Sequence, residues 1–210
     1  MTGLKSLITA LGLAVIGTQA PAATVNFIAP TSGLQTADSM SFDGGFLTVS
    51  ALGSSGFSTV DADVSRSEFG LGVFSAGESG HQRYTLDGKP VGTSETLVLS
   101  FGSEVTLDTL SFAYFDGNDE FVLNDFSSLS LITTGTLTSN TTYASGATGM
   151  TFLLSAIGAP FIDGFGRGND EVKLTGLSYT VAAVPLPAGS LLLLGGLGTI
   201  GALRRRKRTA

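Results

Sequence analysis

The segment ETLVLSFGSEVTLDTLSFAYF, residues 95–115, carries the clearest signal of the fold class. In its first half Leu97, Leu99 and Phe101 alternate with polar or small residues, and the same two-residue period returns over residues 109–115. A period of two is typical of a strand with one buried face, and residues such as Thr and Phe favour strands over helices. The segment therefore predicts two strands of an all-β protein.

Related patterns lie on either side of this segment. Apolar residues alternate over 150–155 and over 173–181, where a phase slip at Gly176 predicts a β-bulge. Clusters of Gly, Asp, Asn and Ser separate the apolar runs, and residues 24–183 contain no sustained helical period. We therefore expect eight or nine short strands in an antiparallel β-sandwich, jelly-roll-like, with an irregular or insertion-like stretch over residues 31–67.

The N-terminal residues 1–23 have the three parts of a signal peptide. Lys5 supplies the positive charge, residues 7–17 form the apolar run, and Ala20 and Ala22 form an A-x-A cleavage site. We expect a mature chain that starts near residue 23 or 24. The chain is then exported, and because it has no cysteine, its stability does not depend on disulfides.

The charge of the expected body, residues 24–183, is strongly negative. It holds all seventeen acidic residues of the 210-residue chain and five of the eleven basic ones, for a net charge of about −12. Nucleic-acid binding needs the opposite sign, so we expect no nucleic-acid partner.

The C-terminal residues 184–210 read VPLPAGSLLLLGGLGTIGALRRRKRTA. Residues 188–203 carry no charge and are expected to form a short transmembrane helix. The membrane stop that follows it is Arg204, Arg205, Arg206, Lys207 and Arg208. By the positive-inside rule this stop lies in the cytoplasm and the body lies outside it.

This tail resembles the PEP-CTERM sorting tail of Gram-negative bacteria, in its VPLPA-CTERM subclass. The signature residues are Val184, Pro185, Leu186, Pro187 and Ala188. The resemblance implies an exosortase-like membrane enzyme as partner, transient anchoring in the inner membrane facing the periplasm, and then a place on the cell surface or outside the cell. It also implies a structural or adhesive role in exopolysaccharide or biofilm.

The body resembles the same family over residues 82–120. In that pattern an acidic loop precedes a Glu-led strand, and a β-hairpin and a second acidic loop follow. The resemblance supports a β-sandwich and implies no substrate.

The sequence offers little for catalysis, and we expect no enzyme activity. It has no cysteine, and its one histidine, His81, stands two residues after Ser79 without the rest of a catalytic triad. The alternative is a secreted carbohydrate-binding or carbohydrate-active β-sandwich protein, because paired carboxylates hydrolyse glycosides and tyrosines form sugar platforms. Tyr84 and Tyr143 are the tyrosines near expected loops.

Calcium is the cofactor that the acidic turns suggest. Residues 117–120 and 168–171 share the motif GNDE, which resembles one turn of a calcium-binding repeat. Carboxylate and amide oxygens are suitable calcium ligands, and the candidates are Asp87, Asp116, Asn118, Asp119 and Asp125. The same residues also suit two ordinary turns without a metal, so the sequence leaves both interpretations open.

Overall fold

The computed structural model describes residues 22–30, 33–55, 58–76, 84–88, 93–115, 119–128, 131–137, 142–156, 170–182 and 196–197. Contacts between Cα atoms divide the chain into a body, Ala20–Ala182, and a second unit made of Met1–Gln19 and Ala183–Ala210. The expected sorting signature, membrane stop and Ala20 lie outside the described ranges. Among the described residues, no helix has the length and hydrophobicity to cross a membrane.

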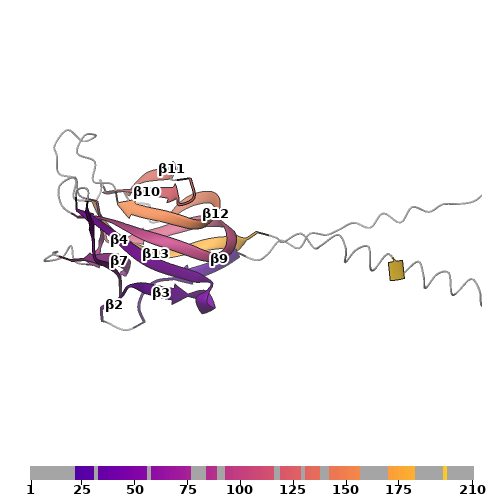
Figure 1. Ribbon diagram of the computed structural model, residues 1–210, viewed down its shortest axis with the longest axis horizontal. Helices are drawn as coiled ribbons and strands as arrows, with labels where there is room; N and C mark the ends of the chain where they lie inside the picture. Colours follow the sequence, from indigo (N-terminus) through magenta and orange to yellow (C-terminus); the bar gives the residue numbers. More distant parts are fainter. Residues whose placement is uncertain are drawn as a thin grey trace, which may run out of the picture. The chain divides into compact units, whose positions relative to one another are not determined.

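The body is all-β and antiparallel, which confirms the predicted class (Figure 1). One short 3-10 turn, η1 (Asp43–Gly45), joins two of its strands. The strands are β1 (Ala22–Asn26), β2 (Gln35–Ala37), β3 (Ser39–Phe42), β4 (Leu47–Ser55), β5 (Ser58–Val60), β6 (Ala62–Ser67), β7 (Gly70–Ser75), β8 (Leu86–Gly88), β9 (Thr93–Ala113), β10 (Asp119–Asp125), β11 (Leu131–Leu137), β12 (Thr142–Ala156) and β13 (Asp170–Val181).

Strand β9 organises the body. It pairs with β12 along most of its length, with β4 through residues 93–101 and with β13 through residues 105–113. The register against β12 jumps between these halves, because Val105 lies opposite Gly149 whereas Ser100 lies opposite Thr151. The extra residues bend the strand without reversing it. The two strands expected over residues 95–115 are therefore one continuous strand, because the chain keeps its direction through the bend.

The core follows the alternation seen in the sequence. Leu97, Leu99, Phe101, Leu110 and Phe112 are all buried in the main hydrophobic cluster. Burial of each such side chain stabilises the fold by about 1.5–3 kcal/mol.

Tyr114 departs from this alternation and is 45% exposed. It lies one residue beyond β9 with a φ of 55°, in the left-handed region that a strand does not use. The residue therefore marks the end of the strand.

Strand β13 is the second organising strand. Besides β9, it pairs with β8 near its start, with β7 at Leu174, and with β1 through residues 176–180. The register shift between Leu174 and Gly176 confirms the predicted bulge.

Residues 31–67 were expected to be irregular or insertion-like, and this expectation is wrong for the described part of the stretch. It forms five strands, β2 to β6, and β4 lies beside β9 in the interior of the network. In Figure 1, β11, β10 and β12 lie on one side of β9, and β13 and β7 lie on the other.

Candidate functional site

Buried polar side chains gather where β7, β8, β9 and β13 meet. We call this group the polar cluster, and its members are Ser75, Thr85, Asp87, Glu95 and Lys173. None of the five is more than 5% exposed. Charged groups are rarely buried without partners, so their contacts decide what this cluster can do.

Glu95 accepts hydrogen bonds through both carboxylate oxygens. The Ser75 hydroxyl donates to Oε1 at 2.5 Å, and the Asp87 backbone N–H donates to Oε2 at 3.1 Å. Glu95 has the same phase as Leu97 and Leu99 on β9, so the strand directs its carboxylate to the buried face. These bonds join three strands, β7, β8 and β9.

Lys173 supplies the positive charge of the cluster. Its Nζ donates to the Tyr84 carbonyl and to the Ser67 hydroxyl, the latter at 3.3 Å. Burial lowers the pKa of Lys173 to about 8, and the nearby Asp87 carboxylate opposes this shift. The Asp87 Oδ1 also accepts a 2.5 Å hydrogen bond from the Thr85 hydroxyl.

Two glycines of β7 allow the backbones to approach closely at this site. A Cβ on Gly72 would lie 2.0 Å from the Tyr84 carbonyl oxygen, and one on Gly70 would lie 2.5 Å from the Leu174 carbonyl oxygen. Gly70 also has a φ of 109°, which side chains rarely adopt. The Gly-Leu-Gly stretch of residues 70–72 therefore serves close strand packing.

The polar cluster holds the segment 84–88 against the neighbouring strands. Its carboxylates and ammonium are buried and hydrogen-bonded within the body. A satisfied buried network fixes one arrangement of the strands around it. Removal of one member takes a hydrogen bond away from its buried partners, which is destabilising.

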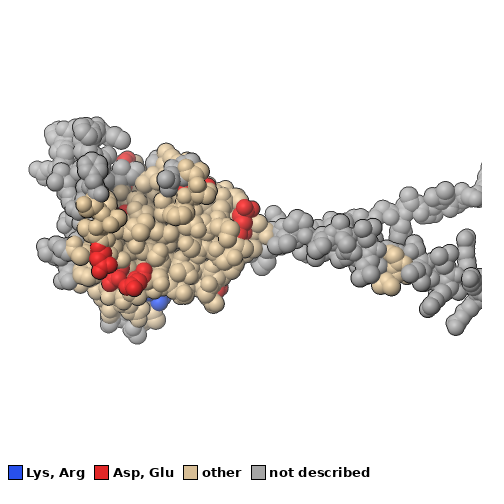
Figure 2. Space-filling view, in the orientation of Figure 1, with Lys and Arg blue, Asp and Glu red and all other residues tan. Residues whose placement is uncertain are grey.

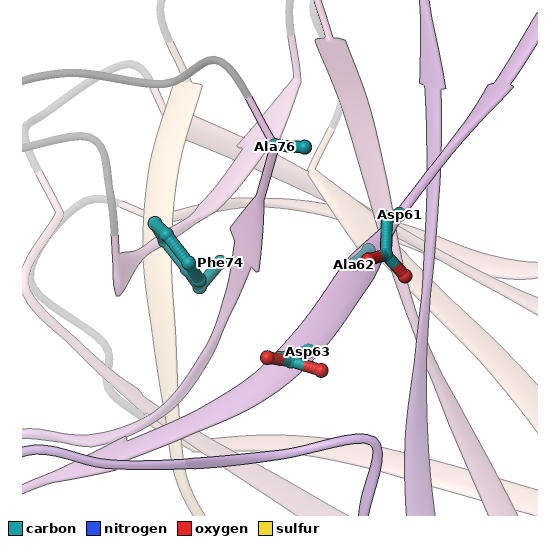
Figure 3. A pocket seen from close by; sticks show the side chains of 5 residues that line it. All are labelled: Asp61, Ala62, Asp63, Phe74 and Ala76. Carbon is teal, nitrogen blue, oxygen red and sulfur yellow. The ribbon is translucent and has the colours of Figure 1, made fainter.

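An acidic pocket lies at β6 and β7. Figure 3 shows the Asp61 and Asp63 carboxylates and the Phe74 ring around it, and its volume is about 50 Å³. Burial, together with the neighbouring Asp38 and Asp61 carboxylates, raises the pKa of Asp63 above its usual value. Acidic side chains also outnumber basic ones on the face drawn in Figure 2.

A larger groove lies where the end of β10 and the middle of β12 meet the bend of β9. It has a volume of about 360 Å³, and its lining residues are Glu104, Asp125, Phe126, Ser127, Thr148, Gly149, Met150 and Thr151. Phe126 and Met150 are each 52% exposed, so both present apolar surface to solvent in the same groove. The groove therefore places an accessible ring beside two carboxylates.

Hydrogen bonds from Ser127 favour the ionised form of the Asp125 carboxyl in this groove. Its Oδ1 accepts hydrogen bonds from the Ser127 backbone N–H at 2.7 Å and from the Ser127 hydroxyl at 2.8 Å, and these bonds lower the pKa of Asp125. The Phe126 N–H donates to the Thr151 carbonyl at 3.1 Å, which fixes the turn against β12.

The predicted calcium ligands do not gather in one place among the residues that can be located. Asp87 belongs to the polar cluster, whereas Asp119 and Asp125 lie at opposite ends of β10, about 20 Å apart at the rise of a strand. Asp116 and Asn118 lie outside the described residues. Within the described ranges, no group of three or more His, Cys, Asp or Glu side chains is arranged to hold a metal ion. Calcium binding stays a prediction.

The tyrosines near loops do not form an exposed platform. Tyr84 and Tyr143 are half-buried, with the Tyr84 ring against Phe74 and the Tyr143 hydroxyl donating to the Thr136 carbonyl. Phe126 was not among the predicted site residues. It lies in the turn directly after β10, and its available signal was a large apolar residue between the polar Asp125 and Ser127.

Comparison with known proteins gives no further assignment, because no family model matches the chain and no curated protein matches it significantly.

Proposed function

We propose that this chain is a secreted bacterial surface or matrix protein, exported by residues 1–23 and processed by an exosortase-like enzyme at the tail 184–210. The observation that carries the proposal is the pairing of β1 with β13, in which Ala22 lies opposite Thr180. Because the two strands are antiparallel, the body begins and ends at the same end of one strand pair. This arrangement suits a precursor that enters the membrane at both ends.

The body folds as a jelly-roll-like β-sandwich in this proposal. The thirteen strands in the described part of the body form one hydrogen-bonded network, and buried side chains from β4, β9, β12 and β13 share a core with those from β1, β6 and β7. A sheet of that many twisted strands has to curl or split into packed layers to bury one core. The bend of β9 between its β4-paired and β13-paired halves provides such a change of layer.

The role of the body is structural or adhesive in extracellular polysaccharide, without catalysis. The buried carboxylates Asp87 and Glu95 support this reading, because they are fully enclosed and bonded to neighbouring strands. The strongly negative net charge of the body favours its solubility after release from the inner membrane.

The test is the intact mass of the protein recovered from the surface and medium of native cells. We expect a chain that begins near residue 23 or 24 and ends within residues 184–188. Substitution of Pro185 and Pro187 by Ala should leave the chain in the inner membrane, whereas Ser190→Ala, two residues past the signature, should be processed normally. A surface chain that still ends at Ala210 would overturn the proposal.

The groove favours a second candidate function, sugar binding. An exposed aromatic ring beside carboxylates suits a sugar, because the ring packs on C–H groups and the carboxylates accept hydroxyl hydrogen bonds. The assay is retention on immobilised neutral polysaccharides, in which Phe126→Ala should abolish binding. Phe69→Ala is the matched control, since Phe69 is 50% exposed but does not line the groove. Equal retention of both variants would exclude this groove as the binding site.

A further inference from the structure

The peptide bond expected to be cut by signal peptidase lies inside a strand of the folded body. Ala22 and Ala23 both belong to β1, where they lie opposite Thr180 and Tyr179 of β13. The A-x-A motif directs cleavage to this region, so the inference rests on the proposed export of the chain. The next bond, Ala23–Thr24, lies in the same ladder.

A bond in a strand ladder is a poor protease substrate. Proteases bind their substrates as extended chains through backbone hydrogen bonds, and the ladder already uses those groups along one edge of the strand. Steric access to the bond is also restricted by the neighbouring strand. Cleavage then depends on the fraction of molecules in which the strand has opened.

The closed strand and the segment after it are firmly held. Val25 is 6% exposed and Phe27 is fully buried, where its ring lies edge-on to Phe42 at 4.8 Å. The Phe27 N–H donates to the Thr175 carbonyl at 2.9 Å. Opening β1 therefore exposes apolar surface and breaks backbone hydrogen bonds at the same time.

Arg66 adds a clamp from β6. Its Nε donates to the Phe27 carbonyl at 2.8 Å, and its Nη2 donates to the Ile28 carbonyl at 3.1 Å. The Ala29 N–H donates to the Ser67 carbonyl at 2.9 Å, which ties the segment to the end of the same strand. These contacts hold the chain directly after β1 in the closed position.

The partner of β1 becomes available only late in export. In the described part of the chain, β1 pairs with β13 alone, and Ala22 precedes its partner Thr180 by 158 residues. The N-terminus leads during synthesis, so β1 emerges before the rest of the body and has to wait for β13. During this interval the cleavage region has no ladder to protect it.

We propose that β1 is a latch whose closure on β13 ends access to the signal cleavage bond, so that signal cleavage has to precede completion of the fold. The latch consists of residues 22–29, held by β13 and by Arg66. A chain that folds before it is cut keeps its signal sequence. The long sequence separation between β1 and β13 delays their pairing, so that cleavage can come before completion of the fold.

The experiment changes the order in which the full chain meets signal peptidase. The full chain is unfolded in urea and diluted into detergent micelles, with signal peptidase either present during dilution or added after refolding. Cleavage is followed by mass spectrometry. We expect efficient cleavage in the first case and at least tenfold slower cleavage in the second.

A substitution at Gly176 tests whether the ladder causes the protection. A Cβ at this position would lie 2.8 Å from the Val25 carbonyl oxygen, so Gly176→Val should displace β1 and restore cleavage after refolding. Gly33→Val is the matched control, because a Cβ there has open space around it. Circular dichroism reports whether Gly176→Val folds. If it does not, Arg66→Gln is the test variant instead, because it removes only the hydrogen bonds from Arg66 to the segment after β1.

Each outcome separates the latch from the export proposal. Equal cleavage in both orders of addition would overturn the latch alone. Protection that neither Gly176→Val nor Arg66→Gln reduces would also overturn it, because the protection would then have another origin. A chain that is not cut during refolding, and whose Gly176→Val and Arg66→Gln variants are not cut either, would overturn the proposed export, and the latch with it.

Discussion

The buried Lys173 makes the stability of the body depend on alkaline pH. Burial lowers the pKa of Lys173 from 10.5 to about 8, a difference of about 2.5 pKa units. At about 1.4 kcal/mol per unit, keeping the buried ammonium charged lowers the free energy of unfolding by about 3 kcal/mol below pH 8. Between pH 8 and pH 10.5 the unfolded chain holds the proton more tightly than the folded chain. The free energy of unfolding therefore rises with pH in that window.

Urea unfolding at pH 7.0 and pH 9.5 measures this effect. Integration of the two proton-binding curves between these values gives a gain of about 2 kcal/mol at pH 9.5. Higher pH is avoided because burial and its hydrogen bond to Asp43 raise the pKa of Tyr179. An unfolded tyrosine ionises near pH 10, so above that pH the raised pKa makes stability fall as pH rises.

Two variants check that Lys173 is the source. Lys173→Met should remove the gain, and the difference from the wild-type chain cancels the titration of other groups. Asp87→Asn should lower the pKa of Lys173 further, because the Asp87 charge opposes the burial effect, and the gain should begin at lower pH. A wild-type unfolding free energy that is flat between pH 7.0 and pH 9.5, or one that still rises by about 2 kcal/mol in Lys173→Met, would show that Lys173 is not the source.

Three further substitutions test the packing of the body. Gly72→Ala places a Cβ 2.0 Å from a carbonyl oxygen and should lower the unfolding free energy by about 1–3 kcal/mol in urea, whereas Gly33→Ala should change it by less than about 0.5 kcal/mol; equal effects would contradict the close approach. Glu95→Gln weakens the charge-assisted hydrogen bond from the Ser75 hydroxyl and should cost about 1–3 kcal/mol by the same measurement, so an unchanged midpoint would argue against the buried contact. Tyr179→Phe removes a buried hydroxyl donor and should cost about 1 kcal/mol below pH 10, while it abolishes the loss of stability above pH 10; a loss that persists in the variant would assign it to another group.

Local sequence patterns predicted the all-β class because the two-residue period directly reports which side of a strand is buried. The bulge at Gly176 was also predictable, since an added residue shifts that period. The single long β9 was not, because its continuity depends on strands β4 and β13, which lie far away in the sequence. Residues 31–67 were misread because their Gly, Ser and Thr content resembles a loop, whereas pairing with neighbouring strands orders them.

The site was harder to predict than the fold. Glu95 carried a usable signal, because a charged residue in phase with Leu97 and Leu99 has to be buried with partners. Lys173 carried no comparable signal, since its two acceptors come from the distant Tyr84 carbonyl and Ser67 hydroxyl. Long-range pairings of this kind follow from the topology and not from local composition.

The pairing of β1 with β13 also determines how the body resists mechanical force. The two strands are antiparallel, and the described body begins and ends at the same end of the pair. A force that pulls both chain ends apart would therefore open the hydrogen bonds of this pair one after another, since they lie perpendicular to the strands. A force applied through β13 alone acts along its axis, where β9 and β1 hold it on both sides and many bonds share the load. A surface protein attached through its C-terminal end alone would bear load in the stronger of these two directions.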